Sequence, residues 1–151
     1  MELSVQGFNR LLAELRASDI PVTIEQTSLS ETINETSDAA LIQLYNVGRQ
    51  PRFPQLTIYF PVSRYDEFPP SPVSFVTNRP ISAKDLLESI QAQYRTRLPP
   101  ASIQAYLQTD PEIYDFLQEE RSPILRDAMV ELIFIEGLEP YQDGYLLQLA
   151  S

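Results

Sequence analysis

Proline divides this chain into short segments and limits the length of each regular element. The sequence contains 13 prolines among its 151 residues. Because proline lacks a backbone N–H and has a fixed φ, it ends helices and interrupts the hydrogen bonds between strands. Pro21 follows a helical pattern, Pro54 and Pro61 flank a strand-like segment, and Pro99-Pro100 close a second helical pattern. We therefore expect short helices and short strands.

The first half of the chain predicts one helix followed by strands. Apolar residues recur at helical spacing over 5–17, with Ser4 as the expected N-cap. Apolar and polar residues alternate in 22–26, 40–47 and 55–60, which is typical of strands. An acidic exposed loop, a proline-rich connection and a fourth short strand are expected at 27–38, 66–72 and 73–76.

The centre of the chain predicts two or three helices. The capping motif SAKD (82–85) begins an apolar helical stripe that continues to Leu98. Two shorter helices are expected at 101–108 and 111–120. The second has a strong start signal, an aspartate as N-cap followed by a proline at the first helical position, Asp110-Pro111.

The C-terminal part returns to strand patterns. Residues 129–136 are apolar on both alternations, which predicts a central strand covered on both faces. A loop over 137–144 and a pairing strand over 145–149 would complete an antiparallel hairpin. This order of elements predicts an α+β fold. We expect a mostly antiparallel sheet, an N-terminal helix and a central group of two or three helices packed on one face.

Composition suits a single domain, 1–151, in an intracellular setting. An apolar content of 43% is enough for one core, and a chain of this length buries about 70% of its unfolded surface. The longest apolar runs, of about four to five residues, are far shorter than the ~20 that a membrane helix needs, so no membrane insertion is expected. The N-terminus lacks the basic and apolar stretches of a signal peptide, and the absence of cysteine fits an intracellular protein that is not secreted.

The residues that carry most recognisable catalytic chemistry are missing. The chain has no histidine, no cysteine and a single lysine, Lys84. The acids of 111–120 fall on a polar helix face, whereas a glycosidase-like pair needs one carboxyl in an apolar pocket. One of Glu131 and Glu136 is expected to point inward and pair with Arg126 or another arginine. We therefore predict no catalytic residue, no cofactor and no metal site, and expect that the protein is not an enzyme.

The charge of the chain bears on its partners. A net charge of −10 and a pI near 4.4 disfavour direct binding to nucleic acid or anionic lipid. They favour a protein partner, either a basic one or a second copy of the chain. The predicted interaction residues combine tyrosines, which are enriched at interfaces, with the helical acids. They are Tyr141, Tyr145, Glu112, Asp115 and Glu119.

The segments SPVSFVTNRPISAKDLLESIQAQY (71–94) and LIFIEGLEPYQDGYLLQLAS (132–151) resemble parts of uncharacterised proteins of giant nucleocytoplasmic DNA viruses. The first is similar to a strand of SPVxF type before a capped helix, ITVxDVLxxIYxxY, and a fungal domain of unknown function shares the helix pattern. The second resembles a closing strand pair, FFEG…YxLxLGS, and departs from it at Ile135 and Ala150. The resemblance implies a viral protein, in the host cytoplasm or the virion, and includes no catalytic motif.

Three functions remain open. The leading hypothesis is a non-enzymatic interaction or structural protein, such as a virion component or a host-factor binder. The second is an acidic nucleic-acid mimic that occupies the basic groove of a DNA-binding protein, with carboxylates supplied by 19–38 and 110–120. The third is a carboxylate-based hydrolase or an oxygen-ligand metal enzyme, which requires two acids that converge in an apolar pocket.

Overall fold

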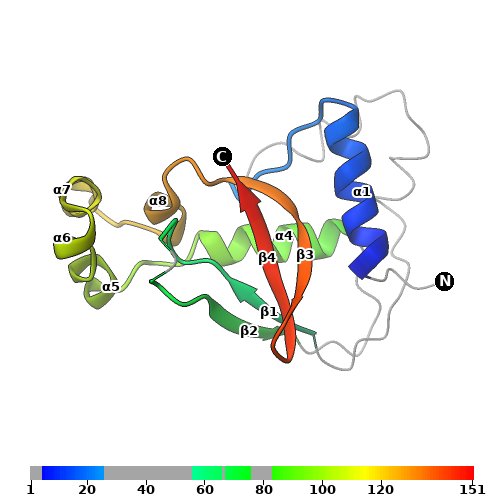
Figure 1. Cartoon of the computed structure of the whole chain (residues 1–151). Helices are drawn as coiled ribbons and strands as arrows, with labels where there is room; N and C mark the ends of the chain where they lie inside the picture. The colour runs from blue at the N-terminus through cyan, green and yellow to red at the C-terminus, as the bar shows by residue number, and fades with distance from the viewer. Residues whose placement is uncertain (1–4, 26–55, 66, 76–82) are drawn as a thin grey trace.

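The computed structural model describes residues 5–25, 56–65, 67–75 and 83–151, and within them four strands form one sheet (Figure 1). The strands lie in the order β2-β1-β4-β3. Two pairs are antiparallel and the central β1–β4 pair is parallel. The fold is α+β with a mostly antiparallel sheet, as predicted. The strand bounds are β1 Leu56–Phe60, β2 Ser71–Phe75, β3 Phe134–Tyr141 and β4 Gly144–Ala150.

The helices lie behind the sheet, beside it and beyond one end of it (Figure 1). The long helix α4 runs behind the sheet, and α1 stands beside β3. Helices α5, α6 and α7 gather past the end of the sheet, and we call this cluster, residues 100–119, the helical end. The helix bounds are α1 Val5–Ala17, α4 Ala83–Tyr94, α5 Pro100–Gln104, α6 Tyr106–Thr109, α7 Pro111–Glu119 and α8 Leu125–Met129. No described helix is long and apolar enough to cross a membrane.

One apolar core joins the sheet to α1 and α4. The predicted stripe of the first helix is buried, and β1 buries every second residue, as its alternation predicts. Helix α4 is amphipathic in the same way, and its apolar side faces the core. The fully buried residues of these three elements include Phe8, Leu11, Leu12, Leu15, Ile58, Phe60, Leu87, Ile90 and Tyr94.

The outer edge of β3 is closed by side-chain and backbone hydrogen bonds from the N-terminal part of the chain. The Asn9 side chain bonds both backbone groups of Leu138, donating to its carbonyl oxygen at 2.8 Å and accepting from its N–H at 2.7 Å. Near the other end of β3, the Ile135 N–H donates to the Val22 carbonyl oxygen at 2.8 Å. Strand geometry makes Pro140 the next outward-facing residue after Leu138, and proline has no N–H to leave unpaired. The edge is thereby protected against pairing with another strand.

The C-terminal prediction of a central strand over 129–136 is wrong. Its first residue, Met129, ends helix α8, and the strand begins only at Phe134. Among the described strands β3 lies at one edge of the sheet, and it continues through most of the predicted loop to Tyr141. The apolar residues on both alternations come from a helix end, a turn and a strand in succession, so they do not mark one strand covered on both faces.

Gly137 allows β3 to pass close to α1. A Cβ atom at this position would lie 2.6 Å from Asn9 Oδ1. The strand register shifts between Ile135 and Gly137, where β3 has an irregularity opposite β4. Gly137 therefore marks a close contact between the strand and the Asn9 side chain, and not a loop.

Other boundaries also differ from the sequence prediction. The strand expected at 22–26 is reduced to a bridge between Thr23 and Phe134. The helix expected to reach Leu98 ends at Tyr94, although Leu98 is buried. The helix expected at 101–108 is divided into α5 and α6 at Ala105. The predictions for 27–38, 40–47 and the Ser82 cap lie outside the described residues.

We expect Asn9→Ala to lower the free energy of unfolding by about 2 kcal/mol, because it leaves the backbone N–H and carbonyl of Leu138 without partners. Urea denaturation of the whole chain measures this loss. Gln6→Ala changes an exposed residue of the same helix and serves as the matched control. Equal stability of the two variants would contradict the edge-closing role of Asn9.

Candidate interaction surface

The segment that follows β1 is tied to the helices by tyrosine hydroxyl groups. The Tyr94 hydroxyl of α4 donates to the Pro61 carbonyl oxygen at 2.8 Å. The Tyr106 hydroxyl of α6 donates to the Val62 carbonyl oxygen at 3.2 Å. A third tyrosine, Tyr65, lies in the tied segment itself and donates to the Asp110 carboxylate at the start of α7. The segment that follows β1 thereby holds α4, α6 and α7 at fixed positions.

Aromatic contacts surround these hydrogen bonds. The Phe68 ring stacks on Tyr106 at a centroid distance of 4.9 Å, and Phe60 meets Tyr94 edge to face at 5.9 Å. Burial raises the pKa of Tyr94 and of Tyr106 above the usual tyrosine value. Both side chains therefore stay protonated and act as hydrogen-bond donors within the core.

Asp110 begins α7 and accepts hydrogen bonds from three residues. Its Oδ1 accepts from the Ile113 N–H at 3.2 Å, which confirms the predicted N-cap. Its Oδ2 accepts from the Tyr65 hydroxyl and from Arg64 Nη2, the latter at 3.0 Å. The Tyr65 hydroxyl contributes most to lowering the pKa of Asp110, and the Ile113 N–H and Arg64 add to it. Asp110 is thus a stable carboxylate, the opposite of a general acid.

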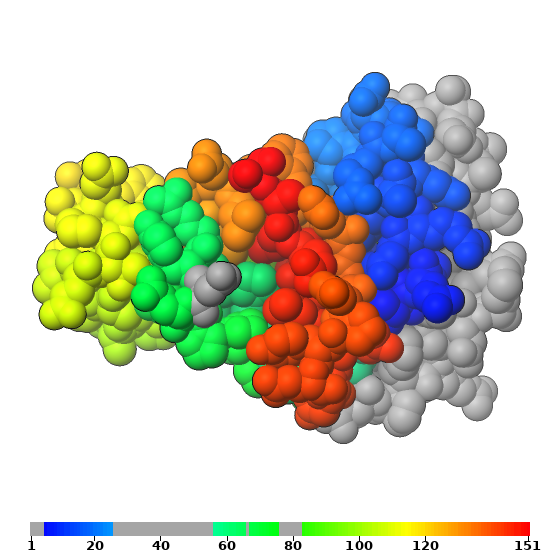
Figure 2. All heavy atoms as spheres, viewed as in Figure 1, coloured from blue at the N-terminus to red at the C-terminus, as the bar shows by residue number. Residues whose placement is uncertain are grey.

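Helix α7 presents the predicted acidic residues to solvent. Glu112, Asp115 and Glu119 are exposed, and we call these three residues the acidic face. Ile113 and Leu117 are buried and fix the orientation of the helix. The acidic face therefore lies on the outside of the helical end, which projects at one end of the molecule (Figure 2, yellow).

Two large apolar side chains are also exposed on the helical end. Phe116 of α7 has 45% of its surface exposed, and Leu107 of the adjoining α6 has 47%. Together with Phe134 they are the exposed large apolar residues of the described part of the chain. Sequence reasoning missed Phe116 and Leu107, although their position off the buried stripe could have indicated them.

The structure places the two predicted tyrosines at the β3–β4 hairpin, away from α7 (Figure 1). Tyr141 is half-buried and meets Tyr59 edge to face at 4.9 Å. Tyr59 in turn donates a hydrogen bond to Asp143 in the hairpin turn. Tyr145 stands opposite Pro140 and packs against the core. The five predicted interaction residues therefore form two separate groups, and only the acidic face carries several exposed charges.

The expected partner of Arg126 is also different in the structure. Arg126 Nε donates to Glu25 Oε1 at 2.6 Å, and neither Glu131 nor Glu136 is its partner. Glu131 is exposed and lies 3.9 Å from Arg64. Glu131 thus pairs with another arginine, as the prediction allowed, but the predicted inward orientation is wrong because residues 130–133 follow α8 as a turn and leave Glu131 exposed.

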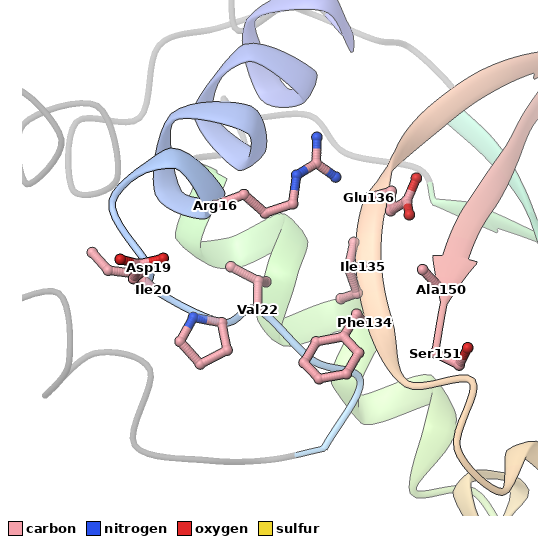
Figure 3. Close-up of a pocket in the computed structure, with 10 residues that line it drawn as sticks. Arg16, Asp19, Ile20, Val22, Phe134, Ile135, Glu136, Ala150 and Ser151 are labelled. Carbon is pink, nitrogen blue, oxygen red and sulfur yellow. The ribbon is translucent and has the colours of Figure 1, made fainter.

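A shallow pocket lies at the start of β3, with a volume of about 440 Å³ (Figure 3). Phe134 and Val22 line it, and Arg16 lies between the carboxylates of Asp19 and Glu136 (Figure 3). The two acids are on opposite sides of the pocket, so they do not form the close pair that a carboxylate-based hydrolase needs. Within the described ranges, no group of three or more acidic side chains is placed to hold a metal ion.

The lowered pKa of Asp110 predicts an acid-sensitive stabilisation. A carboxyl whose pKa is lower in the folded state stabilises the fold above its unfolded-state pKa, and this contribution is lost as the pH falls through the folded-state value. Asp110→Asn keeps a capping side chain but removes the charge. We expect the stability difference between wild type and Asp110→Asn to shrink between about pH 6 and about pH 2.

Urea denaturation at both pH values measures this difference. Tyr65→Phe removes the largest cause of the lowered pKa, so the pH dependence of this variant should lie between those of wild type and Asp110→Asn. A difference that is the same at both pH values would show that Asp110 does not contribute through its charge.

Comparison of the chain with protein-family models, with curated proteins and with solved structures finds no significant match.

Proposed function

We propose that this protein is a non-enzymatic interaction module that binds a basic protein partner through the helical end. The observation that carries the proposal is the acidic face next to an exposed phenylalanine, Phe116, on the same helix. Interfaces commonly combine an aromatic anchor with a surrounding polar rim. A single exposed apolar residue is ordinary, but α6 and α7 pack together and each exposes one.

The charge of the helical end supports a basic partner. Residues 99–120 contain no lysine or arginine, and their acids are Asp110, Glu112, Asp115, Glu119 and Glu120. Arg64 pairs with Asp110, and the other four acids make no ion pair within the residues that the structure describes. At 1.5 Å per residue, the members of the acidic face lie about 4.5 and 6 Å apart along the helix axis. These spacings are shorter than the screening length of about 8 Å at physiological salt, so the three charges act together.

The setting that we propose for this interaction is viral. The resemblance of 71–94 and 132–151 to giant-virus proteins favours a virion component or a host-factor binder, in the virion or the host cytoplasm. The regular spacing of carboxylates on α7 also suits the alternative function, an acidic mimic of a nucleic-acid backbone. Both functions use the acidic face, and they differ in whether DNA competes for the same partner.

A defined probe tests the proposal, namely a fluorescent peptide of alternating arginine and leucine whose binding is followed by anisotropy. We expect the variant Glu112→Gln/Asp115→Asn/Glu119→Gln to bind this peptide about tenfold more weakly. Exposed ion pairs contribute about 0.5 kcal/mol each, and three of them approach the ~1.4 kcal/mol that corresponds to tenfold. Phe116→Ala should weaken binding further without changing its salt dependence.

A matched control removes the same number of charges elsewhere. The variant Glu88→Gln/Glu136→Gln/Glu139→Gln changes three exposed acids outside the helical end and should bind like wild type. Equal weakening in the two triple variants would overturn the proposal, because it would reflect net charge alone. For the mimic alternative, duplex DNA should compete with the chain for a basic DNA-binding protein, and absence of competition excludes it.

A further inference from the structure

A groove separates the sheet from the helical end, and none of the three residues of the acidic face lines it. It has a volume of about 550 Å³, within the range of ~300–1,000 Å³ that is usual for small-molecule sites. One wall comes from the segment after β1, including Phe68 and Pro69, and the other from the α4–α5 connection and α5. Small side chains on the helical wall, Ala101, Ser102 and Ala105, leave the space open.

The floor of the groove is apolar. Phe60 is fully buried, and Tyr106 and Leu98 are only 2% and 6% exposed. The Tyr106 hydroxyl and the Thr96 hydroxyl are already engaged, with the carbonyl oxygens of Val62 and Gln93. The floor therefore offers contacts to a hydrocarbon group and few hydrogen bonds to a polar one.

Among the described residues that line the groove, Arg97 is the only cation and none carries a carboxylate. Arg97 Nη2 donates to Ser122 Oγ at 3.1 Å. Within the described ranges, Arg97 makes no ion pair with an acid. The guanidinium has five N–H donors, so donors remain for an anionic ligand. In a chain with 21 acidic residues, an arginine that the described acids leave unpaired, beside a groove that they do not line, is a local reversal of charge.

We propose that the groove binds a small apolar carboxylate, such as a medium-chain fatty acid, with its hydrocarbon chain on the floor and its carboxylate at Arg97. The apolar floor favours the hydrocarbon chain of the ligand. The guanidinium favours a planar anion that it can hold through two hydrogen bonds. The net charge of −10 does not prevent this, because physiological salt screens exposed charges beyond about 8 Å. The site is independent of the acidic face and of the function proposed for it.

Three ligands with the same chain and different head groups test the proposal on the full-length protein. Octanoate, 1-octanol and octylammonium are titrated, and amide chemical shifts are followed by ¹H–¹⁵N NMR. We expect octanoate to shift the amides of Thr96, Leu98 and Ala105 at lower concentration than 1-octanol, and octylammonium to bind most weakly. The amide of Leu146, on the outer face of the sheet, should not move.

Two variants separate the roles of charge and cavity. Arg97→Gln should weaken octanoate binding about tenfold, a change of about 1.4 kcal/mol, and leave 1-octanol binding unchanged. Ala105→Phe should fill the groove and weaken both ligands. Arg121→Gln, which removes an exposed arginine outside the groove, is the matched control and should bind octanoate like wild type.

The proposal is overturned if octanoate does not bind at millimolar concentration. It is also overturned if the three head groups bind equally, or if Arg97→Gln and Arg121→Gln have the same effect. Far-ultraviolet circular dichroism of each variant confirms that it is folded, and Arg97→Lys, which keeps the charge, should retain more affinity for octanoate than Arg97→Gln.

Discussion

Two tyrosine hydroxyl groups, of Tyr65 and Tyr106, hold the helical end of this protein against the segment after β1, and a third, of Tyr94, fixes α4 to the same segment. Tyr94, Tyr106 and Tyr65 connect the segment after β1 to α4, α6 and the start of α7. The helical end contains short helices, of four to nine residues, which are not stable in isolation. Their position therefore depends on these contacts. The same contacts fix the geometry of the acidic face and of the groove.

The two sides of the fold meet different physical demands. At β3, Asn9 and Pro140 prevent an exposed strand from pairing with other chains, and Gly137 leaves room for the Asn9 side chain. At the helical end, the side chains that hold the structure point inward, so acids and Phe116 can face solvent without disturbing the core.

Sequence reasoning predicted the parts of this fold that depend on local patterns. The first helix, β1 and α7 with its Asp110 cap follow from apolar spacing and capping chemistry. It could not predict contacts between distant segments. The Asn9–Leu138 hydrogen bonds join residues that are far apart in the sequence. The apolar pattern of 129–136 is compatible both with one strand and with a helix end followed by a strand. Among the proposed interaction residues, the exposure of Glu112, Asp115 and Glu119 was predictable from helical spacing. The position of Arg97 beside the groove required the structure.

The most direct test of this account is amide hydrogen exchange in the double variant Tyr65→Phe/Tyr106→Phe. Exchange reports local opening, segment by segment. The account predicts faster exchange across residues 100–119, including the Tyr114 N–H that bonds the Asp110 carbonyl oxygen, while the β3–β4 hairpin keeps its wild-type protection. Unchanged exchange at the helical end, or an equal loss of protection in the hairpin, would contradict the claim that these tyrosines hold the helical end in place.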